Sequence, residues 1–221
     1  MQPDWLIWQL ADSAFPAGAF AHSAGLEAAW QLGEIASARD LSDWISTSLQ
    51  QTGHALVPAV AAAWEGAMPL PEVDAFCESF LLNHVANRAS RAQGQALLMA
   101  CERTFDVEAV RRVAETVRKE GLAGHFAPVF GAVGRALDIP RRRGCELFLF
   151  MGLRGAVSSA VRLGIVGPLQ GQGLQHRLAA VAGGIVERCI DIPLEQAAQT
   201  APLADLIQGA HDRLYSRLFV S

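Results

Sequence analysis

One short segment, residues 21–25 (AHSAG), carries residue types that could perform hydrolysis. Its serine, Ser23, has the AxSxG spacing of a nucleophile elbow, in which a sharp turn presents a serine hydroxyl for attack on an ester or amide. Such an elbow requires a strand that feeds the turn, and the preceding residues 13–18 (SAFPAG) have the composition of a loop. A serine hydrolase that uses Ser23 is therefore an alternative function for this chain, and stoichiometric labelling of Ser23 by a fluorophosphonate would support it.

Common metal-binding and cofactor-binding patterns do not occur in the sequence. The six histidines include no HxH or HxxxH pair, and the four cysteines lack the close spacing of a zinc or redox site: Cys77, Cys101, Cys145 and Cys189. Gly171 and Gly173 begin a GxGxxG pattern, but His176 takes the place of its third glycine. We therefore expect no bound metal or cofactor, reduced cysteines in the core, and histidines that act as ordinary hydrogen-bonded side chains.

The net charge and the hydrophobic content limit the classes of partner. With 18 basic and 22 acidic residues the net charge is −4, which argues against binding nucleic acid by neutralising its phosphates. The basic run Arg141–Arg143 is too short to reverse this, and we interpret it as the solvated start of a helix. Hydrophobic residues make up 51% of the chain, so we expect helices buried on more than one face, or a surface that another protein covers.

The N-terminus and the longest apolar stretch indicate a cytoplasmic protein that does not cross a membrane. The first residues lack the basic region and apolar run of a signal peptide. The stretch 145–161 is interrupted by Glu146, Arg154 and two glycines, which favours burial in protein over a membrane span.

Helical periodicity runs through nearly the whole chain. Apolar residues recur at three- and four-residue intervals from Leu41 to Leu49, from Val107 to Val117 and from Leu203 to Leu214. Ser37 and Asp40 form a start of the capping-box type before the first stripe, whereas the alternating β-branched segments of strands are missing. The fold class that we predict is all-α.

Glycine and proline breakers divide the chain into about nine or ten helices. They fall at residues 15–18, Gly53, 66–71, Gly121, 139–140, 164–171 and 192–193. Because no joint is a long polar linker and no internal repeat is evident, we expect a single-domain helical bundle that spans residues 1–221.

Several segments together resemble one protein family. Residues 10–27 (LADSAFPAGAFAHSAGLE), here called the signature segment, contain a serine, Pro-x-Gly, an aromatic, a serine and Gly-Leu-Glu in order. Residues 211–221 (HDRLYSRLFVS), here called the C-terminal tail, match the closing motif His-Glu-x-x-Tyr-Ser-Arg-Leu-Phe-x-Ser of the same family. Residues 124–131, 160–164 and 167–172 add further matches. In these segments the chain resembles the UreF urease accessory proteins.

The chain departs from the family pattern at a few positions. Many members carry a serine and an aromatic or similar residue in place of Ala21 and His22, and often an arginine in place of Val220. Residues 89–90 are Ala-Ser where many bacterial relatives have Glu-Thr. These differences bear on individual contacts of the protein and leave the family resemblance unchanged.

The resemblance implies a function in protein assembly and no enzymatic turnover. A UreF-like protein is expected to be all-helical, to form a homodimer, and to bridge UreD (also called UreH) and the GTPase UreG, so that nickel reaches apo-urease. The partners implied are therefore UreD/UreH, UreG and apo-urease, with no nucleic acid and no membrane. A generic helical adaptor protein is the second alternative function, beside the serine hydrolase.

Six residues are the candidates for partner binding. Tyr215, Arg217, Leu218 and Phe219 lie in a tail too short to bury itself, and we expect them to dock into UreD, with the aromatic and the arginine as anchors. The alternative is that Leu218 and Phe219 fold back onto the core of their own chain.

Glu27 and Arg162 complete the set. They match family positions that are implicated in the surface facing UreG, and the alternative is that both are ordinary charges on helix surfaces. A trans-acting arginine can also stabilise the transition state of a GTPase, so Arg162 could modulate UreG directly. The glycines and prolines around residues 15–18 and Gly25 are expected to shape a tight turn into the second helix.

Overall fold

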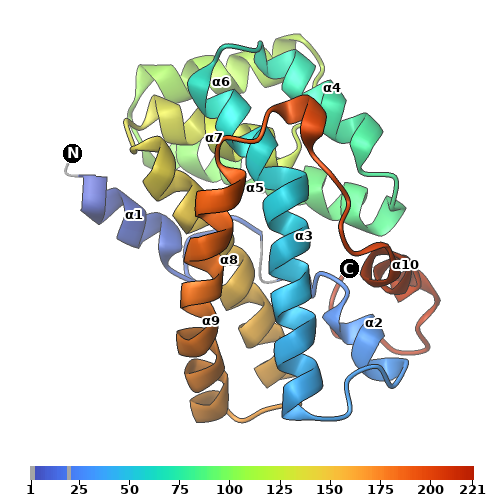
Figure 1. The fold of residues 1–221 in the computed structure, drawn as a ribbon. Coiled ribbons are helices and arrows are strands. Elements are labelled where there is room, and N and C mark those ends of the chain that lie inside the picture. The colour runs from blue at the N-terminus through green and yellow to red at the C-terminus, as the bar shows by residue number, and fades with distance from the viewer. Residues whose placement is uncertain (1–2, 19–20) are drawn as a thin grey trace.

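The computed structural model describes residues 3–18 and 21–221, which form a bundle of helices (Figure 1). Met1, Gln2, and Ala19 and Phe20 of the signature segment lie outside the described residues. The described ranges contain ten α-helices and no strand. Their bounds are α1 (Pro3–Ala11), α2 (Leu26–Gln31), α3 (Ala38–Glu65), α4 (Leu70–Phe80), α5 (His84–Thr104), α6 (Glu108–Lys119), α7 (Phe126–Ala136), α8 (Arg141–Arg162), α9 (Pro168–Cys189) and α10 (Pro202–Gly209). The all-α prediction is confirmed.

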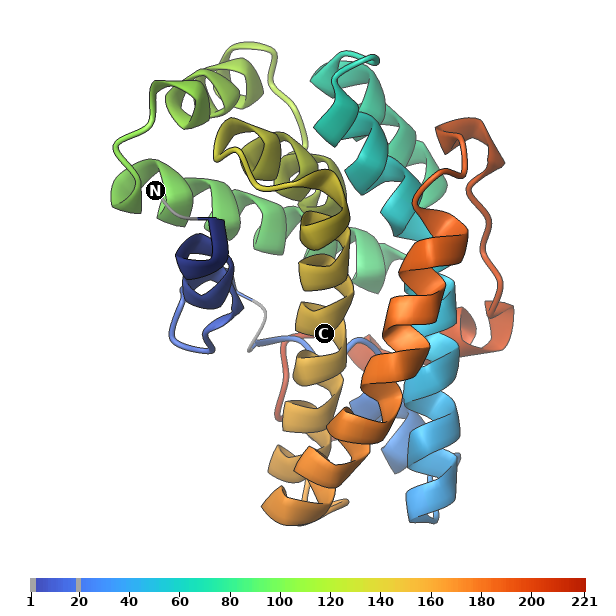
Figure 2. The ribbon, with the colours of Figure 1, turned by 60° about the vertical axis from the view of Figure 1, so that its left-hand side comes forward.

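Three long helices, α3, α8 and α9, run side by side, and the shorter α4–α7 gather around one end of them (Figures 1 and 2). One continuous cluster of buried side chains joins these elements, including Leu41, Ile45, Leu149, Leu153 and Ile185. Burial on this scale, at roughly 25 cal/mol per Å² of apolar surface, is the main force that holds the bundle together. All four cysteines are buried and free, as expected, and burial raises the pKa of three of them, Cys77, Cys101 and Cys145, to about 12.

The start of α3 and most of the breaks between helices follow the sequence prediction. Ser37 Oγ accepts a hydrogen bond from the amide of Asp40 at 3.2 Å, and the Asp40 carboxylate accepts one from the amide of Ala36 at 3.1 Å. At the other end, Gly66 has a φ of +66°, a left-handed conformation that terminates α3 at little steric cost.

Gly53 is a correction, because it does not break a helix. It lies inside α3, where a Cβ atom would come within 2.1 Å of Ile185 Cγ2 on α9. The missing side chain therefore lets two long helices approach closely, and tertiary packing outweighs the low helix propensity of glycine.

The last helix is a second correction. The stripe from Leu203 to Leu214 predicts one helix with a packed face, but α10 ends at Gly209 and a 3₁₀ turn (His211–Arg213) follows it. No residue of α10 is fully buried, and Leu203 and Leu206 are largely exposed. Pro202 does occupy the first turn, where its missing N–H costs little.

The apolar α8 is a core helix. By length and composition alone it could cross a membrane, yet 56% of its most apolar 18-residue stretch is buried inside the protein. Its first residues are Arg141–Arg143, and these pair with carboxylates of neighbouring elements, among them Asp191 at 2.6 Å and Glu187 at 2.7 Å. The basic run is thus the start of a helix, as the sequence indicated, and its ion pairs with these carboxylates were not predicted.

Candidate functional site

The C-terminal tail packs against the end of the signature segment, so two motifs that are 184 or more residues apart form one site. The amide of Ser23 donates to the carbonyl of Ser221 at 2.6 Å, and the amide of Val220 donates to the carbonyl of Ala21 at 2.8 Å. His22 Nδ1 lies 2.5 Å from Ser221 Oγ, which adds a side-chain hydrogen bond. In Figure 1 the C-terminus accordingly lies next to α3, close to α2 and α10.

Glu27, in the first turn of α2, is the centre of this site. Its carboxylate accepts hydrogen bonds from the amide of Leu218 at 2.6 Å, the amide of Phe219 at 3.1 Å, and His211 Nε2 at 3.1 Å. The residue is only 1% exposed, and His211 is fully buried. A buried carboxylate is stable when its oxygens are satisfied in this way. The sequence reading that placed Glu27 on a helix surface is therefore wrong.

A sharp turn brings Glu27 into position. Ala24 and Gly25 both have left-handed backbones, with φ of 51° and 85°. A Cβ atom on Gly25 would lie 2.9 Å from Gln208 Cβ on α10, so glycine is needed for conformation and for space. The expected tight turn into the second helix is confirmed.

Asp212 anchors the beginning of the tail to α5. Arg88 donates two hydrogen bonds to its carboxylate, at 2.8 and 3.0 Å, while His84 and Arg217 lie at 3.2 and 3.3 Å. The hydrogen bonds from Arg88 are the main reason that the pKa of Asp212 lies below its usual range. This exposed cluster complements the buried contacts at Glu27.

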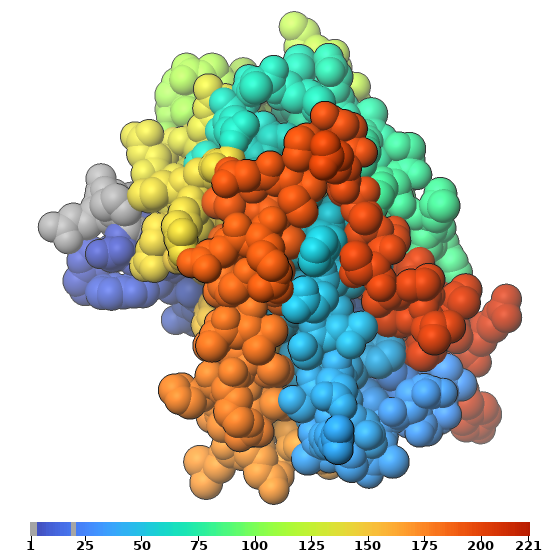
Figure 3. Space-filling view, viewed as in Figure 1, coloured from blue at the N-terminus to red at the C-terminus, as the bar shows by residue number. Residues whose placement is uncertain are grey.

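The predicted tail residues divide between buried and exposed positions. Phe219 is buried, and the Arg162 guanidinium lies over its ring at 4.2 Å from the centroid, a cation–π contact. Tyr215 is fully exposed and Leu218 is 53% exposed, while Arg217 is half-exposed beside Asp212. Phe219 thus folds back onto its own chain, whereas Tyr215 and Leu218 face solvent. In Figure 3, the C-terminal part of the chain (red) lies beside the N-terminal part that includes α2 (blue).

Ser23 is not placed as a nucleophile. It is 2% exposed, its hydroxyl lies 3.2 Å from the Ser221 carbonyl, and its Oγ is 3.4 Å from the Glu27 amide. Residues 13–18 form a loop, as their composition indicated, and the neighbouring His22 pairs with Ser221. The strand that a nucleophile elbow requires is missing from the described residues.

His125, in a segment that resembles the family, is a hydrogen-bonded structural residue. It is fully buried, with Nε2 at 2.7 Å from Glu78 Oε2 and Nδ1 at 3.1 Å from Ser90 Oγ. The buried Asp74 carboxylate accepts the His125 amide at 2.8 Å, which anchors the start of α7. Among the described residues, no group of three or more His, Cys, Asp or Glu side chains is arranged to hold a metal ion.

Comparisons with known proteins agree with these motifs. The protein named "Urease accessory protein F" of Arabidopsis thaliana is 36% identical over 221 residues, covering 98% of this chain and 92% of the plant protein. Its namesake from Oryza sativa subsp. indica is 35% identical over 219 residues, covering 97% of this chain and 84% of the rice protein. A protein-family model described as UreF matches residues 35–179. The chain belongs to the UreF family.

The part of the chain that matches the UreF family model lies between the two halves of the site. The signature segment precedes residue 35 and the tail follows residue 179, although the alignments with the plant relatives cover nearly the whole chain. In this UreF-family protein the matched region supplies the scaffold, and the two flanking segments meet on it.

Sequence reasoning missed several residues of the site, namely Arg88, His211, Asp212 and Ser221. His211, Asp212 and Ser221 belong to the closing motif that identified the family, so the motif contained the signal without a role for each residue. Arg88 comes directly before residues 89–90, where the chain departs from the family pattern, but nothing in the sequence indicated its partner Asp212, which is 124 residues away.

Proposed function

We propose that this UreF-family protein acts in the cytoplasm as a homodimer that bridges UreD/UreH and the GTPase UreG during nickel delivery to apo-urease. The observation that carries the proposal is the tail, which combines an anchored backbone with outward-facing Tyr215 and Leu218. Interfaces favour exposed aromatic and aliphatic side chains on a rigid support, because little conformational entropy is then lost on binding.

The UreD contact is tested with a double variant that leaves the anchors in place. Tyr215→Ala with Leu218→Ala keeps Phe219, Ser221 and the amides that bind Glu27, so the tail should stay folded while UreD is lost from the complex. Co-expression with UreD followed by size-exclusion chromatography measures the result. Leu169→Ala is the control, since Leu169 is equally apolar and highly exposed at the start of α9.

Deletion of residues 215–221 gives the stronger form of the same test. We expect it to abolish UreD binding and to preserve the helical content, because the ten helices of the described residues end before residue 215. Overall stability should fall, because the deletion removes the amides of Leu218 and Phe219 that donate to Glu27. Full retention of UreD by both the deletion and the double variant would contradict tail docking and favour a generic helical adaptor.

For UreG we assign different roles to Glu27 and Arg162. Glu27 is a positioning residue, since it is buried and holds the tail. Arg162 is half-buried at the end of α8, next to the tail, and is the candidate for direct contact. Arg162→Glu should therefore weaken UreG recruitment, because it would place like charges together in the contact with UreG. Phe219→Leu is the matched control, because it removes the ring contact of Arg162 without changing its charge.

Direct modulation of GTP hydrolysis is a separate form of this proposal. If Arg162 supplied a trans-acting arginine, Arg162→Gln would lower GTP turnover by UreG in the complex while recruitment stayed intact. Equal turnover with the wild-type chain and with Arg162→Gln would leave Arg162 as a docking residue only.

A further inference from the structure

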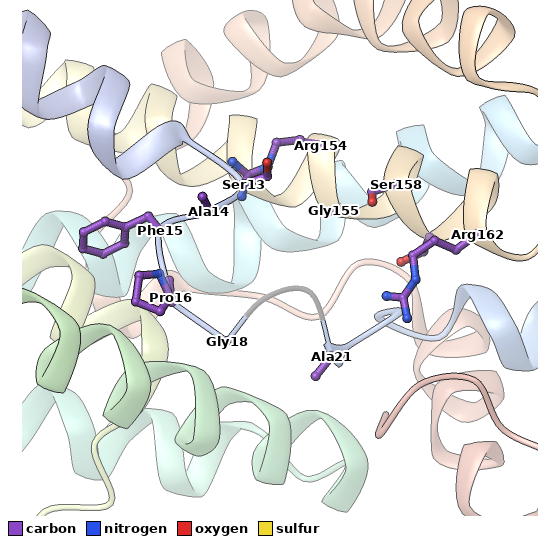
Figure 4. A pocket seen from close by; sticks show the side chains of 12 residues that line it. Ser13, Ala14, Phe15, Pro16, Gly18, Ala21, Arg154, Gly155, Ser158 and Arg162 are labelled. Atoms are coloured by element: carbon purple, nitrogen blue, oxygen red, sulfur yellow. The ribbon is translucent and has the colours of Figure 1, made fainter.

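A pocket of about 360 Å³ lies between the Ser13–Gly18 loop and the second half of α8 (Figure 4). Arg154, Ser158 and Arg162 line it at intervals of four residues, which places them on one face of the helix. Figure 4 shows the Arg154 side chain reaching toward Ser13 and that of Arg162 reaching toward Ala21. The two cationic side chains thus stand at opposite ends of the pocket.

The walls of the pocket differ in chemistry. The loop contributes the apolar side chains of Ala14, Phe15 and Pro16, and Phe15 is held in place by stacking on Phe105, with ring centroids 6.1 Å apart. The helix contributes arginine and serine side chains. A ligand that fits both walls needs apolar groups as well as negative charge.

The guanidinium of Arg154 is hydrogen-bonded to the protein backbone. It donates to the carbonyl of Ala11, and among the described residues Asp12 is the only charged group that shifts the pKa of Arg154. The negative charge of Asp12 raises the pKa of Arg154 electrostatically. However, Asp12 Oδ1 already accepts a hydrogen bond from the Ala14 amide at 2.7 Å. Burial lowers the pKa of Arg154, as expected for a cation that lacks a close anionic partner. An anion that entered the pocket would supply this partner.

The separation of the two arginines indicates the shape of the ligand. The Cα atoms of two residues eight positions apart on an α-helix are about 12 Å apart. Because the Arg154 side chain reaches toward Ser13 and the Arg162 side chain toward Ala21 (Figure 4), one small anion would not bridge the two guanidinium groups. In an extended peptide, two carboxylates four residues apart are separated by about 13 Å. Guanidinium groups bind carboxylates in bidentate geometry, and the apolar wall would receive the side chains between them.

We propose that this pocket binds an extended acidic segment of a partner protein, with two carboxylates that flank apolar residues. One carboxylate pairs with Arg154 and the other with Arg162, and the residues between them pack on Ala14, Phe15 and Pro16. The pocket borders the tail at Arg162, which also lies over the Phe219 ring and is the candidate contact for UreG. The inference therefore rests on the proposed bridging function and deepens it, because it names the kind of partner segment that this surface would bind.

A defined peptide tests the proposal without UreD or UreG. The probe is acetyl-Glu-Ala-Leu-Ala-Glu-amide, titrated into the ¹⁵N-labelled protein while the amides of residues 13–18 and the Arg154 Nε–H are followed by NMR. We expect saturable shifts in this region that weaken with added salt. The double variant Arg154→Gln/Arg162→Gln should weaken binding at least tenfold, whereas Arg112→Gln, an exposed arginine on α6, should leave it unchanged.

A second variant tests the location without altering charge. A Cβ atom on Gly155, which lines the pocket, would meet no atom within 4 Å, so Gly155→Leu should fill the pocket and weaken the peptide as well. The proposal is overturned if millimolar peptide gives no saturable shift, or if the Gln-for-Glu peptide binds equally. Glutarate alone producing the same saturable shifts would also overturn it, in favour of a small-molecule site. Because neither UreD nor UreG is present, failure here is distinguishable from failure of the bridging function.

Discussion

At the scale of single residues, the contacts of Glu27 govern the candidate site. One carboxylate receives two backbone amides of the tail and the imidazole of the buried His211. Hydrogen bonds to a charged acceptor contribute more than neutral ones, and removal of the acceptor leaves buried donors without a partner. Glu27 thus stabilises the fold of this chain through contacts that need no partner protein.

Replacing Glu27 should therefore destabilise the protein. Glu27→Ala leaves three donors without their acceptor, and we expect a loss of about 2–4 kcal/mol in the free energy of unfolding. Urea denaturation followed by circular dichroism measures it. Glu34→Ala, an exposed glutamate just after α2, is the control and should change stability by less than about 0.5 kcal/mol. Similar stability of the two variants would contradict the role of Glu27 as an anchor.

His22 should make the contact between tail and signature segment sensitive to pH. Burial lowers its pKa, with smaller contributions from the charges of Arg88 and His211. Since the unfolded chain binds the proton more readily, the stabilising effect of neutral His22 is complete above about pH 6.5 and is lost as the pH falls below it. Unfolding at pH 7.5 and 5.5 should differ more for the wild type than for His22→Gln. An equal difference in both proteins would refute the assignment.

At the scale of elements, glycines inside helices allow the bundle to pack closely. A Cβ atom on Gly131 of α7 would lie 2.3 Å from the carbonyl oxygen of Val60 on α3. Similarly, Gly134 and Gly144 make room for the Trp64 ring. These residues carry a cost in helix propensity that the close approach of the helices outweighs.

Replacing a helix glycine by alanine at a buried site and at an exposed site distinguishes the effect of helix packing from that of helix propensity. Gly131→Ala should destabilise the protein by about 1–3 kcal/mol, because the methyl group meets α3 backbone. Gly183→Ala, on the exposed side of α9 with no atom within 4 Å of its Cβ position, should stabilise it by about 0.5–1 kcal/mol. Thermal unfolding of both variants is the measurement, and a gain in stability at Gly131 would contradict the close contact.

At the scale of the whole molecule, the scaffold and the site differ in how deeply they are buried. The helices α3, α7, α8 and α9 share the core, whereas α10 has no fully buried residue and the tail depends on a few anchors. Regions with few buried apolar contacts open at lower free energy than core helices. The surface proposed to bind UreD is therefore the less stable part of the fold.

Hydrogen exchange should reveal this gradient. We expect amides of α10 and the 3₁₀ turn to exchange faster than those in the middle of α3 and α8, and UreD binding to slow exchange in the tail specifically. Mass spectrometry of peptic fragments, with and without UreD, provides the measurement. Exchange in α10 as slow as in α3 would contradict the proposed order of stability.

The sequence by itself determined the fold class, the family and most of the helix boundaries. Periodicity, Ser37 and breakers such as Gly66 act through local backbone preferences, and the structure follows them. The same local reasoning was wrong at Gly53. In a sequence, a glycine that ends a helix looks the same as a glycine that lets two helices approach closely. It also overstated the last helix, because periodicity does not report whether a partner element covers the stripe.

Only the tertiary structure decided where the candidate residues lie and what they contact. The sequence placed Glu27 on a surface and left open whether Phe219 docks into a partner or folds back onto its own chain. In the structure both residues are buried against segments that lie far away along the chain. It likewise gave no reason to pair Arg88 with Asp212, or to place Arg154 and Arg162 beside the Ser13–Gly18 loop. The physical reason is that burial and charge pairing depend on contacts between distant segments, which form only when the core brings those segments together.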